Sequence, residues 1–139
     1  NYGMNIITKY SRADAFTLDQ KELKLAFPTH ILDERTALGK LSAHLGCDGW
    51  LTRGAEGAYG KEGQVIHECP AFTLTVKDTV GAGDAFYSIA GLYTAAGATT
   101  ELGLFMGNIA GALGANIVGN KESVEKVNVL KYAGTLMNV

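Results

Sequence analysis

The spacing of hydrophobic positions changes several times along this chain of 139 residues. Short runs rich in β-branched and aromatic residues predict strands. These runs span 13–18, 50–52, 58–59, 64–67 and 72–76, and the third and fourth are expected to form a hairpin around Gly60–Gly63. Elsewhere apolar residues recur every three or four positions, which predicts helices. The helices are expected at about 19–27, 34–45, 84–96, 100–115 and 122–137.

This alternation of strands and helices is typical of an α/β fold with a mostly parallel sheet. We expect about four to six strands, with the nearly all-helical last third covering one face of the sheet. Two helix ends carry local signals. Asp19 is placed to cap the first helix, and Gly46 is placed to end the second.

One stretch requires a test for membrane insertion. Residues 102–120 carry no charge, and Gly103, Gly107 and Gly111 repeat at four-residue spacing, as in the packing face of a transmembrane helix. The same stretch holds five glycines and three asparagines, so its hydrophobicity is mediocre. A helix buried between a sheet and its neighbours is therefore the favoured explanation.

The composition narrows the class of protein. Hydrophobic residues make up 47% and charged residues 19%, as in ordinary soluble globular proteins. A net charge of -2 gives no basic surface for nucleic acid or an anionic membrane. Cys47 and Cys69 are isolated and the three histidines are scattered, so we expect two reduced thiols rather than a disulfide, and no structural metal site. The chain begins with Asn1 and carries no leader-like segment, so we expect part of a longer, cytoplasmic protein.

The segment Asp78-Thr79-Val80-Gly81-Ala82-Gly83-Asp84 lies between a predicted strand and a predicted helix. Its small residues leave the N–H groups of the turn accessible, and the helix adds unpaired N–H groups and the positive end of its dipole. Together they predict a pocket for an anion such as a transferring phosphoryl group. Asp84, in the first helical turn, could accept a proton from an attacking hydroxyl. On these residues alone, an ordinary turn whose aspartate complements the helix dipole is the commoner explanation.

Two better-known glycine signatures do not fit. The dinucleotide fingerprint requires a small residue where Phe86 stands. The Walker loop requires serine or threonine after Gly60-Lys61, where the chain has Glu62. Phosphate binding would therefore follow another scheme.

The segment 78–84 closely resembles the second signature of the ribokinase-like sugar kinases, the PfkB family, and the match continues through residue 91. Three further segments resemble family motifs in the same order. Residues 52–57 are similar to its Thr-x-Gly-x-x-Gly, which contacts nucleotide phosphates, and 108–123 to its closing segment beside the adenine. Residues 19–22 are similar to its Asn-x-x-Glu, with Asp19 in place of the asparagine. The resemblance covers the chain from about residue 12 onward.

The resemblance implies that residues 1–139 form the carboxy-terminal, nucleotide-binding portion of a kinase domain, a partial three-layer, Rossmann-like α/β sheet flanked by helices. It implies transfer of a phosphoryl group from ATP to a sugar hydroxyl, with Mg²⁺ and a potassium-type cation as cofactors. The implied catalytic residues are Asp84 as the base and the amides of Gly81, Ala82 and Gly83. The implied nucleotide-binding residues are Thr52, Gly54, Gly57 and Asn108. Glu22 would hold Mg²⁺ through water, and Asp78, Val80, Gly119 and Ser123 would bind the monovalent cation.

Structural explanations compete with several of these roles. Glu22 would be a solvated position on a helix, Thr52 and Gly54 the end of a strand, and Ser123 the start of a helix. Asn108 would be a satisfied polar group between packed helices. Arg53 would either reach a phosphate or be an exposed surface arginine.

The sugar-binding features of the family, which belong to its amino-terminal half, do not occur in this sequence. The resemblance therefore implies that an upstream part holds the sugar or sugar phosphate, and that these 139 residues alone turn over negligibly and bind nucleotide weakly. Residues 1–5 resemble the junction in kinase domains fused to a nucleotidyltransferase, which would make the substrate a heptose phosphate or a relative. The alternative is a non-catalytic nucleotide-binding or assembly module with a degenerate kinase fold. The intact Gly81–Asp84 argues against it, whereas Asp19 leaves it open.

Overall fold

The computed structural model describes residues 6–28, 33–72, 81–115 and 126–137. In these ranges four strands form one sheet in the order β1-β2-β3-β4. The strands are β1 (Phe16–Asp19), β2 (Gly49–Thr52), β3 (Ala58–Glu62) and β4 (Val65–Cys69). The helices are α1 (Gln20–Ala26), α2 (Glu34–Leu45), α3 (Ala82–Ala95), α4 (Thr100–Ala115) and α5 (Lys126–Met137), with two 3-10 turns, η1 (Ile7–Lys9) and η2 (Gly54–Glu56).

The predicted α/β class is confirmed, but the sheet is not mostly parallel over the residues described. Only β1 and β2 pair in parallel, whereas β2 with β3 and β3 with β4 pair antiparallel. Short connections explain the difference, because a parallel pair needs a crossover of a dozen or more residues and neither β2–β3 nor β3–β4 has one. The predicted hairpin is present with longer strands, so its turn is Gly63-Gln64 alone, with Gly63 at φ +56°. The strand predicted at 72–76 lies outside the described residues from 73 onward.

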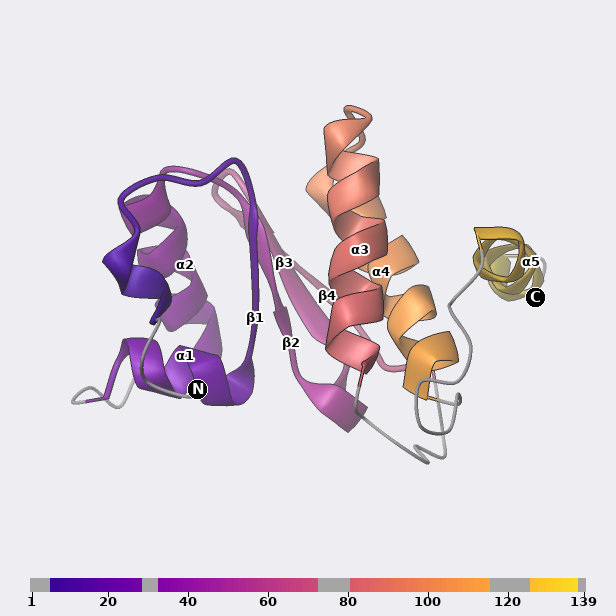
Figure 1. Ribbon diagram of the computed structural model, residues 1–139, viewed down its shortest axis with the longest axis horizontal. Coiled ribbons are helices and arrows are strands. Elements are labelled where there is room, and N and C mark those ends of the chain that lie inside the picture. Colours follow the sequence, from indigo (N-terminus) through magenta and orange to yellow (C-terminus); the bar gives the residue numbers. More distant parts are fainter. Residues whose placement is uncertain (1–5, 29–32, 73–80, 116–125, 138–139) are drawn as a thin grey trace.

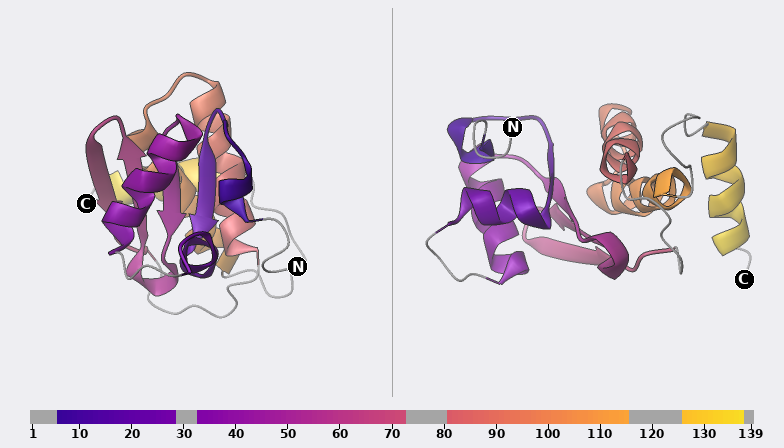
Figure 2. Two further views of the ribbon diagram at one scale, coloured as in Figure 1. Left: turned by 90° about the vertical axis from the view of Figure 1, so that its left-hand side faces the viewer. Right: turned by 60° about the horizontal axis from the view of Figure 1, so that its bottom comes forward.

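The elements stack in layers (Figure 1). Helices α1 and α2 cover one face of the sheet, and α3 and α4 cover the other. Helix α5 lies beyond α4 and packs against that helix, as the right-hand view of Figure 2 also shows. The prediction that the last helices cover one face is thus confirmed for α3 and α4 and wrong for α5. Helix α4 is buried on two sides, and Ile109 and Ala110 join a cluster with Val129 of α5.

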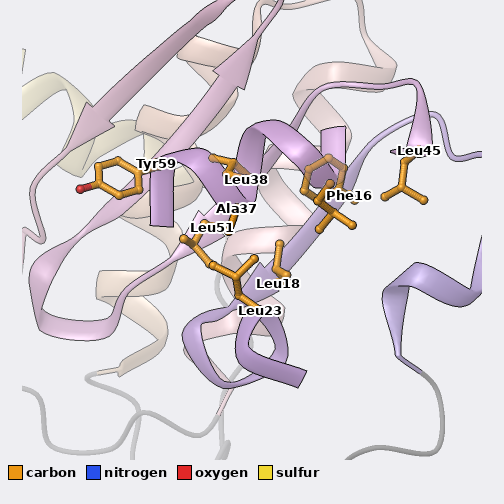
Figure 3. Close-up of a cluster of buried hydrophobic side chains, with 9 residues drawn as sticks. Phe16, Leu18, Leu23, Ala37, Leu38, Leu45, Leu51 and Tyr59 are labelled. Carbon is orange, nitrogen blue, oxygen red and sulfur yellow. The ribbon is translucent and has the colours of Figure 1, made fainter. Parts of the chain in front are cut away.

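Side chains from alternate strand positions build two cores on opposite faces of the sheet. Phe16, Leu18 and Leu51 pack with the leucines of α2 in the cluster drawn in Figure 3. Trp50, one position before Leu51, points to the other face and packs edge-on against Phe86 of α3 at 6.4 Å between ring centroids. The period of two along each strand therefore places the two helical layers.

Local capping explains where α1 and α2 begin and end. Asp19 caps α1, as predicted, and Gly46 ends α2 in the left-handed region at φ +67°. The first residue of α2 follows Asp33, whose carboxylate accepts hydrogen bonds from the backbone N–H of Thr36 at 2.9 Å and from its hydroxyl at 2.6 Å. These contacts join residues at most four positions apart, so the sequence already contains them.

The small-residue stripe of α4 faces the rest of the protein. A Cβ atom on Gly107 would lie 3.1 Å from both Phe86 and Ala90 of α3, and one on Gly103 would lie 2.9 Å from the Trp50 ring. These glycines let α3 and α4 approach closely. Across the described ranges, no helix is long and apolar enough to cross a bilayer. This packing confirms the buried-helix explanation for residues 102–115, whereas residues 116–120 lie outside the described residues.

Candidate functional site

The predicted anion-binding turn opens α3. Gly81 occupies the N-cap position in the left-handed region at φ +88°, and no side chain caps the helix. The first main-chain hydrogen bond is donated by Ala85 to the Gly81 carbonyl at 2.9 Å. The N–H groups of Ala82, Gly83 and Asp84 therefore have no acceptor among the described residues, as expected for a first helical turn. Gly83 is exposed, and a Cβ atom there would meet none of the described residues within 4 Å, so the backbone at this position is accessible.

Asp84 projects from this turn with an exposed side chain. Its carbonyl accepts a hydrogen bond from the Ser88 hydroxyl at 2.8 Å, which is a helix-internal contact. Within the part of the chain described, no donor binds the Asp84 carboxylate. As far as the described residues go, both carboxylate oxygens can accept a proton or a hydrogen bond from a substrate.

Close packing against α4, rather than polar contacts, sets the position of this turn. A Cβ atom on Gly111 would lie 3.3 Å from the Ala82 carbonyl oxygen, and one on Gly114 would lie 3.1 Å from the Cβ of Ala85. Larger residues at these positions of α4 would push the start of α3 away.

The carboxyl ends of the parallel strands β1 and β2 carry the other predicted residues. Thr52 lies opposite Asp19 in the register, and its hydroxyl donates to the Leu18 carbonyl at 3.4 Å. This pairing brings residues 19–22 and 52–57 to one edge of the sheet, although they are about thirty positions apart in the sequence. Figure 1 places the start of α3 at the same end.

Glu22 takes part in a reciprocal cap. The Asp19 N–H donates to Glu22 Oε2 at 2.9 Å, and the Glu22 N–H donates to Asp19 Oδ1 at 2.8 Å. An asparagine in place of Asp19 would offer the same Oδ1, so the departure from the family pattern leaves this cap intact. Glu22 is exposed, and among the described residues nothing binds its Oε1. Because its Oε2 takes part in the cap, Glu22 is not only a solvated position on a helix.

The loop after β2 requires two glycines. Gly54 is exposed at φ +57°, with nothing within 4 Å of a would-be Cβ, which leaves its backbone accessible. Gly57 is buried at φ +97°, and a Cβ there would overlap the Cys69 carbonyl oxygen. The Arg53 N–H closes the loop by donating to the Gly57 carbonyl at 2.8 Å.

Arg53 is neither an exposed surface arginine nor a free cation facing a phosphate. Its side chain is only 13% exposed, and its guanidinium lies 4.3 Å from the centre of the Tyr59 ring. Its Nε donates to Glu34 at 2.6 Å, and its Nη2 donates to Glu56 at 2.5 Å. Burial acts to lower the pKa of Arg53, but its hydrogen bond to Glu34 and the electrostatic attraction of Glu34, Tyr59 and Glu56 together outweigh burial, so the net pKa is raised. Sequence reasoning missed this network because its members come from three separate segments, namely α2, the loop after β2, and β3.

Asn108 lies on α4 and reaches the end of β4. Its side-chain amide donates to the Pro70 carbonyl and contacts the Cys69 sulfur at 3.4 Å. It is therefore a satisfied polar group between packed elements, and its predicted adenine contact stays a prediction. Burial raises the pKa of the Cys69 thiol, and the Asn108 hydrogen bond acts in the opposite direction. Cys69 and the half-buried Cys47 are both free thiols.

Several predicted ligands cannot be placed. Asp78, Val80, Gly119 and Ser123, the proposed monovalent-cation residues, lie outside the described residues. Among the residues that are described, no group of three or more His, Cys, Asp or Glu side chains is placed to hold a metal ion. Glu22 is thus a single carboxylate, a donor set that fits contact with the water shell of Mg²⁺ better than direct coordination.

A polar cavity of about 470 Å³ lies at the opposite end of the sheet. Its lining includes Asp48, before β2, and Glu62, at the end of β3. No sequence signal pointed to it, and it contains none of the predicted site residues.

The structure is an α/β domain in which a glycine-bearing helix start lies at the carboxyl edge of the sheet, beside an aspartate that has no donor among the described residues. The profile of the pfkB family carbohydrate kinases matches residues 9–126, and the chain belongs to this family. The predicted family is confirmed. Among curated proteins, none matches the sequence significantly.

Solved structures share the fold. Phosphofructokinase-2 from Escherichia coli in complex with potassium matches with a TM-score of 0.81 and 19% identity, over 94% of this chain and 43% of that one. Ribokinase from Thermotoga maritima matches with a TM-score of 0.76 and 22% identity, over 87% of this chain and 42% of that one. Arabidopsis thaliana ribokinase complexed with ribose and ATP matches with a TM-score of 0.69 and 20% identity, over 85% and 40%. The chain spans less than half the length of each.

Proposed function

We propose that this chain supplies the ATP site, the anion hole and the catalytic base of a cytoplasmic carbohydrate kinase that phosphorylates a sugar hydroxyl. One observation carries the proposal: the Asp84 carboxylate, which has no donor among the described residues, lies beside first-turn N–H groups that likewise have no acceptor there. Such a helix start attracts anions. Membership of the pfkB family supports a carbohydrate as the phosphoryl acceptor.

In this proposal Asp84 removes the proton from the attacking sugar hydroxyl as its oxygen bonds to the γ-phosphorus of ATP, and ADP leaves. The N–H groups of Gly81, Ala82 and Gly83 donate hydrogen bonds to the oxygens of the transferring group. Preorganised donors of this kind stabilise charge that develops in the transition state, commonly the largest catalytic contribution.

The nucleotide would extend along the carboxyl edge of the sheet. The accessible backbone of Gly54, together with Thr52 and Gly57, would contact the phosphates. The Asn108 amide nitrogen already donates to Pro70, so Oδ1 is the atom left for the adenine amino group. Glu22 Oε1 would hold a water of the Mg²⁺ shell, and the ion would neutralise phosphate charge. The potassium-type site at residues 78, 80, 119 and 123 stays a prediction.

The sugar is proposed to bind largely through a part of the kinase that these 139 residues do not contain. The solved structures are more than twice as long as the matched region, which supports that division. Hydrogen bonds to particular hydroxyls would choose the sugar, and such bonds discriminate strongly.

The decisive experiment is Asp84→Asn in the kinase chain that contains these residues, assayed for transfer from ATP to a panel of free sugars and sugar phosphates. We expect transfer to fall by about a hundredfold to ten-thousandfold, because the amide cannot accept the proton. ATP affinity, measured by equilibrium binding, should change less than about twofold.

Glu101→Gln is the matched control, because Glu101 is also an exposed first-turn carboxylate but belongs to α4. Its turnover should equal that of the unchanged chain. If Asp84→Asn retains turnover, the assignment of Asp84 as the catalytic base is wrong. An unchanged chain that binds ATP but phosphorylates nothing in the panel would favour the degenerate module.

A further inference from the structure

Glu34, the first residue of α2, connects two segments of the proposed nucleotide site. Its Oε1 accepts a hydrogen bond from Gln20 Nε2 at 2.6 Å, and its Oε2 accepts one from Arg53 Nε at 2.6 Å. The Glu34 side chain is 30% exposed, so both bonds are partly shielded from water. One carboxylate thus uses a separate oxygen for each segment.

The first segment is the start of α1. Gln20 stands between Asp19 and Glu22, the two residues of the reciprocal cap. Holding the Gln20 side chain fixes the end of α1 from which the Glu22 carboxylate projects.

The second segment is the loop after β2. Arg53 stands between Thr52 and Gly54, and its own N–H closes the loop onto Gly57. Its guanidinium carbon lies over the Tyr59 ring, 4.3 Å from the ring centre, so a fixed Arg53 side chain also fixes the loop backbone.

We infer that Glu34 is a positioning residue of the nucleotide site, whose carboxylate sets the spacing between Glu22 and the phosphate-binding loop 52–57. This inference rests on the proposed function. Glu34 itself touches neither ATP nor sugar, and it acts through Gln20 and Arg53. A shift of about 1 Å in such groups can reduce catalysis substantially.

The other acidic partners of Arg53 do not provide this connection. Glu56 belongs to the same loop, and Glu68 lies 3.6 Å from Arg53 and pairs with Arg35 at 2.7 Å. Of the carboxylates described around Arg53, only Glu34 also bonds to α1. Removing Glu56 or Glu68 would weaken the hold on the guanidinium without separating the two segments.

A simpler role for Glu34 is to stabilise the start of α2 through the helix dipole. Asp33→Asn separates the two roles. Asp33 caps the same helix end one residue earlier, and its carboxylate bonds to Thr36 rather than to Gln20 or Arg53. It is therefore the matched control for Glu34→Ala.

The first test compares Glu34→Ala with Asp33→Asn in the kinase chain. We expect Glu34→Ala to raise the KM for ATP about tenfold while the KM for the sugar stays within about twofold. Glu34→Gln should recover part of the loss, because its amide can bond to Arg53 and to a rotated Gln20 amide. Asp33→Asn should leave both KM values within about twofold. Equal ATP KM values for Glu34→Ala and Asp33→Asn would overturn the inference and leave the proposed function intact.

The second test does not need catalysis. Amide hydrogen exchange should accelerate at both 20–23 and 54–57 in Glu34→Ala, and at neither segment in Asp33→Asn. If the unchanged chain neither binds ATP nor phosphorylates a sugar, the proposed function fails. The hydrogen-exchange measurement still tests whether Glu34 connects the start of α1 to the loop after β2. Acceleration at only one segment, or at none, would overturn this connection.

Discussion

The two parts of the candidate site are held in place by different kinds of interaction. The start of α1 and the loop after β2 are fixed by hydrogen bonds and ion pairs among Asp19, Glu22, Glu34 and Arg53. The start of α3 is fixed by backbone-close packing on the glycines of α4, with no side-chain cap. In the first part these polar side chains bond to one another. In the second part the first-turn N–H groups and the Asp84 carboxylate have no partner among the described residues.

The first-turn carboxylates of the two helices show what this difference means. One carboxylate oxygen of Glu22 accepts a hydrogen bond from the Asp19 N–H, whereas no donor among the described residues binds the Asp84 carboxylate. A paired carboxylate stabilises local structure, and an unpaired one beside open N–H groups is available to a ligand. This contrast is consistent with the proposed roles, in which Glu22 stabilises the start of α1 and Asp84 acts on the substrate. Three stability measurements test the contrast.

The largest expected effect comes from the packing that positions α3. Gly107→Leu would force a side chain between α4 and Phe86 and Ala90, where even a Cβ would lie 3.1 Å away. We expect a loss of about 3 kcal/mol in the free energy of unfolding, measured by urea denaturation.

Gly134→Ala in α5 is the control, since a Cβ there meets nothing within 4 Å. It should gain about 1 kcal/mol from helix propensity. A Gly107→Leu chain as stable as the unchanged one would show that close helix packing does not hold the start of α3.

A smaller effect is expected at the polar cap of α1. Asp19→Ala removes the acceptor for the Glu22 N–H and should cost about 1 kcal/mol of unfolding free energy. Asp19→Asn keeps an oxygen at that position and should cost only a few tenths of a kcal/mol. If the two variants lose the same stability, the reciprocal cap is not what fixes α1.

The smallest effect is a pH dependence at the cap of α2. The Thr36 hydroxyl and N–H hold the pKa of Asp33 below its ordinary value of 3.8. A carboxyl with a lower pKa in the folded state adds stability above its unfolded pKa and loses it as the pH falls through the folded pKa. Stability should therefore decline between about pH 5 and pH 3, and decline less in Asp33→Asn, when denaturation is measured across this range. Identical declines would show that Asp33 contributes nothing.

Much of the fold was predictable because its signals are local. The apolar spacing and Gly46 gave α2 its observed range, and Asp19 marked the start of α1. The start of β1 and the length of the hairpin were predicted less well, because strand ends depend on which partner strand continues. The strand predicted at 13–18 is β1 at 16–19 in the structure, and the helix predicted at 84–96 is α3 at 82–95.

The residues of the candidate site also fall into those that the sequence identifies and those that depend on distant partners. The glycines and Asp84 could be found from the sequence because a helix start is built from consecutive residues. The partners of Asn108 and Arg53 could not be found from the sequence, because Pro70, Glu34 and Tyr59 are distant in the sequence or belong to other elements.

The sequence by itself determined the helices, their caps, the open turn before Asp84 and the family, since each depends on neighbours within a few positions or on a continuous motif. Only the tertiary structure decided the strand directions, the exclusion of α5 from the sheet and the pairing of Arg53. Those features are contacts between distant segments, and many pairings compatible with the same local pattern compete for them. Packing and charge compensation over the whole fold select one.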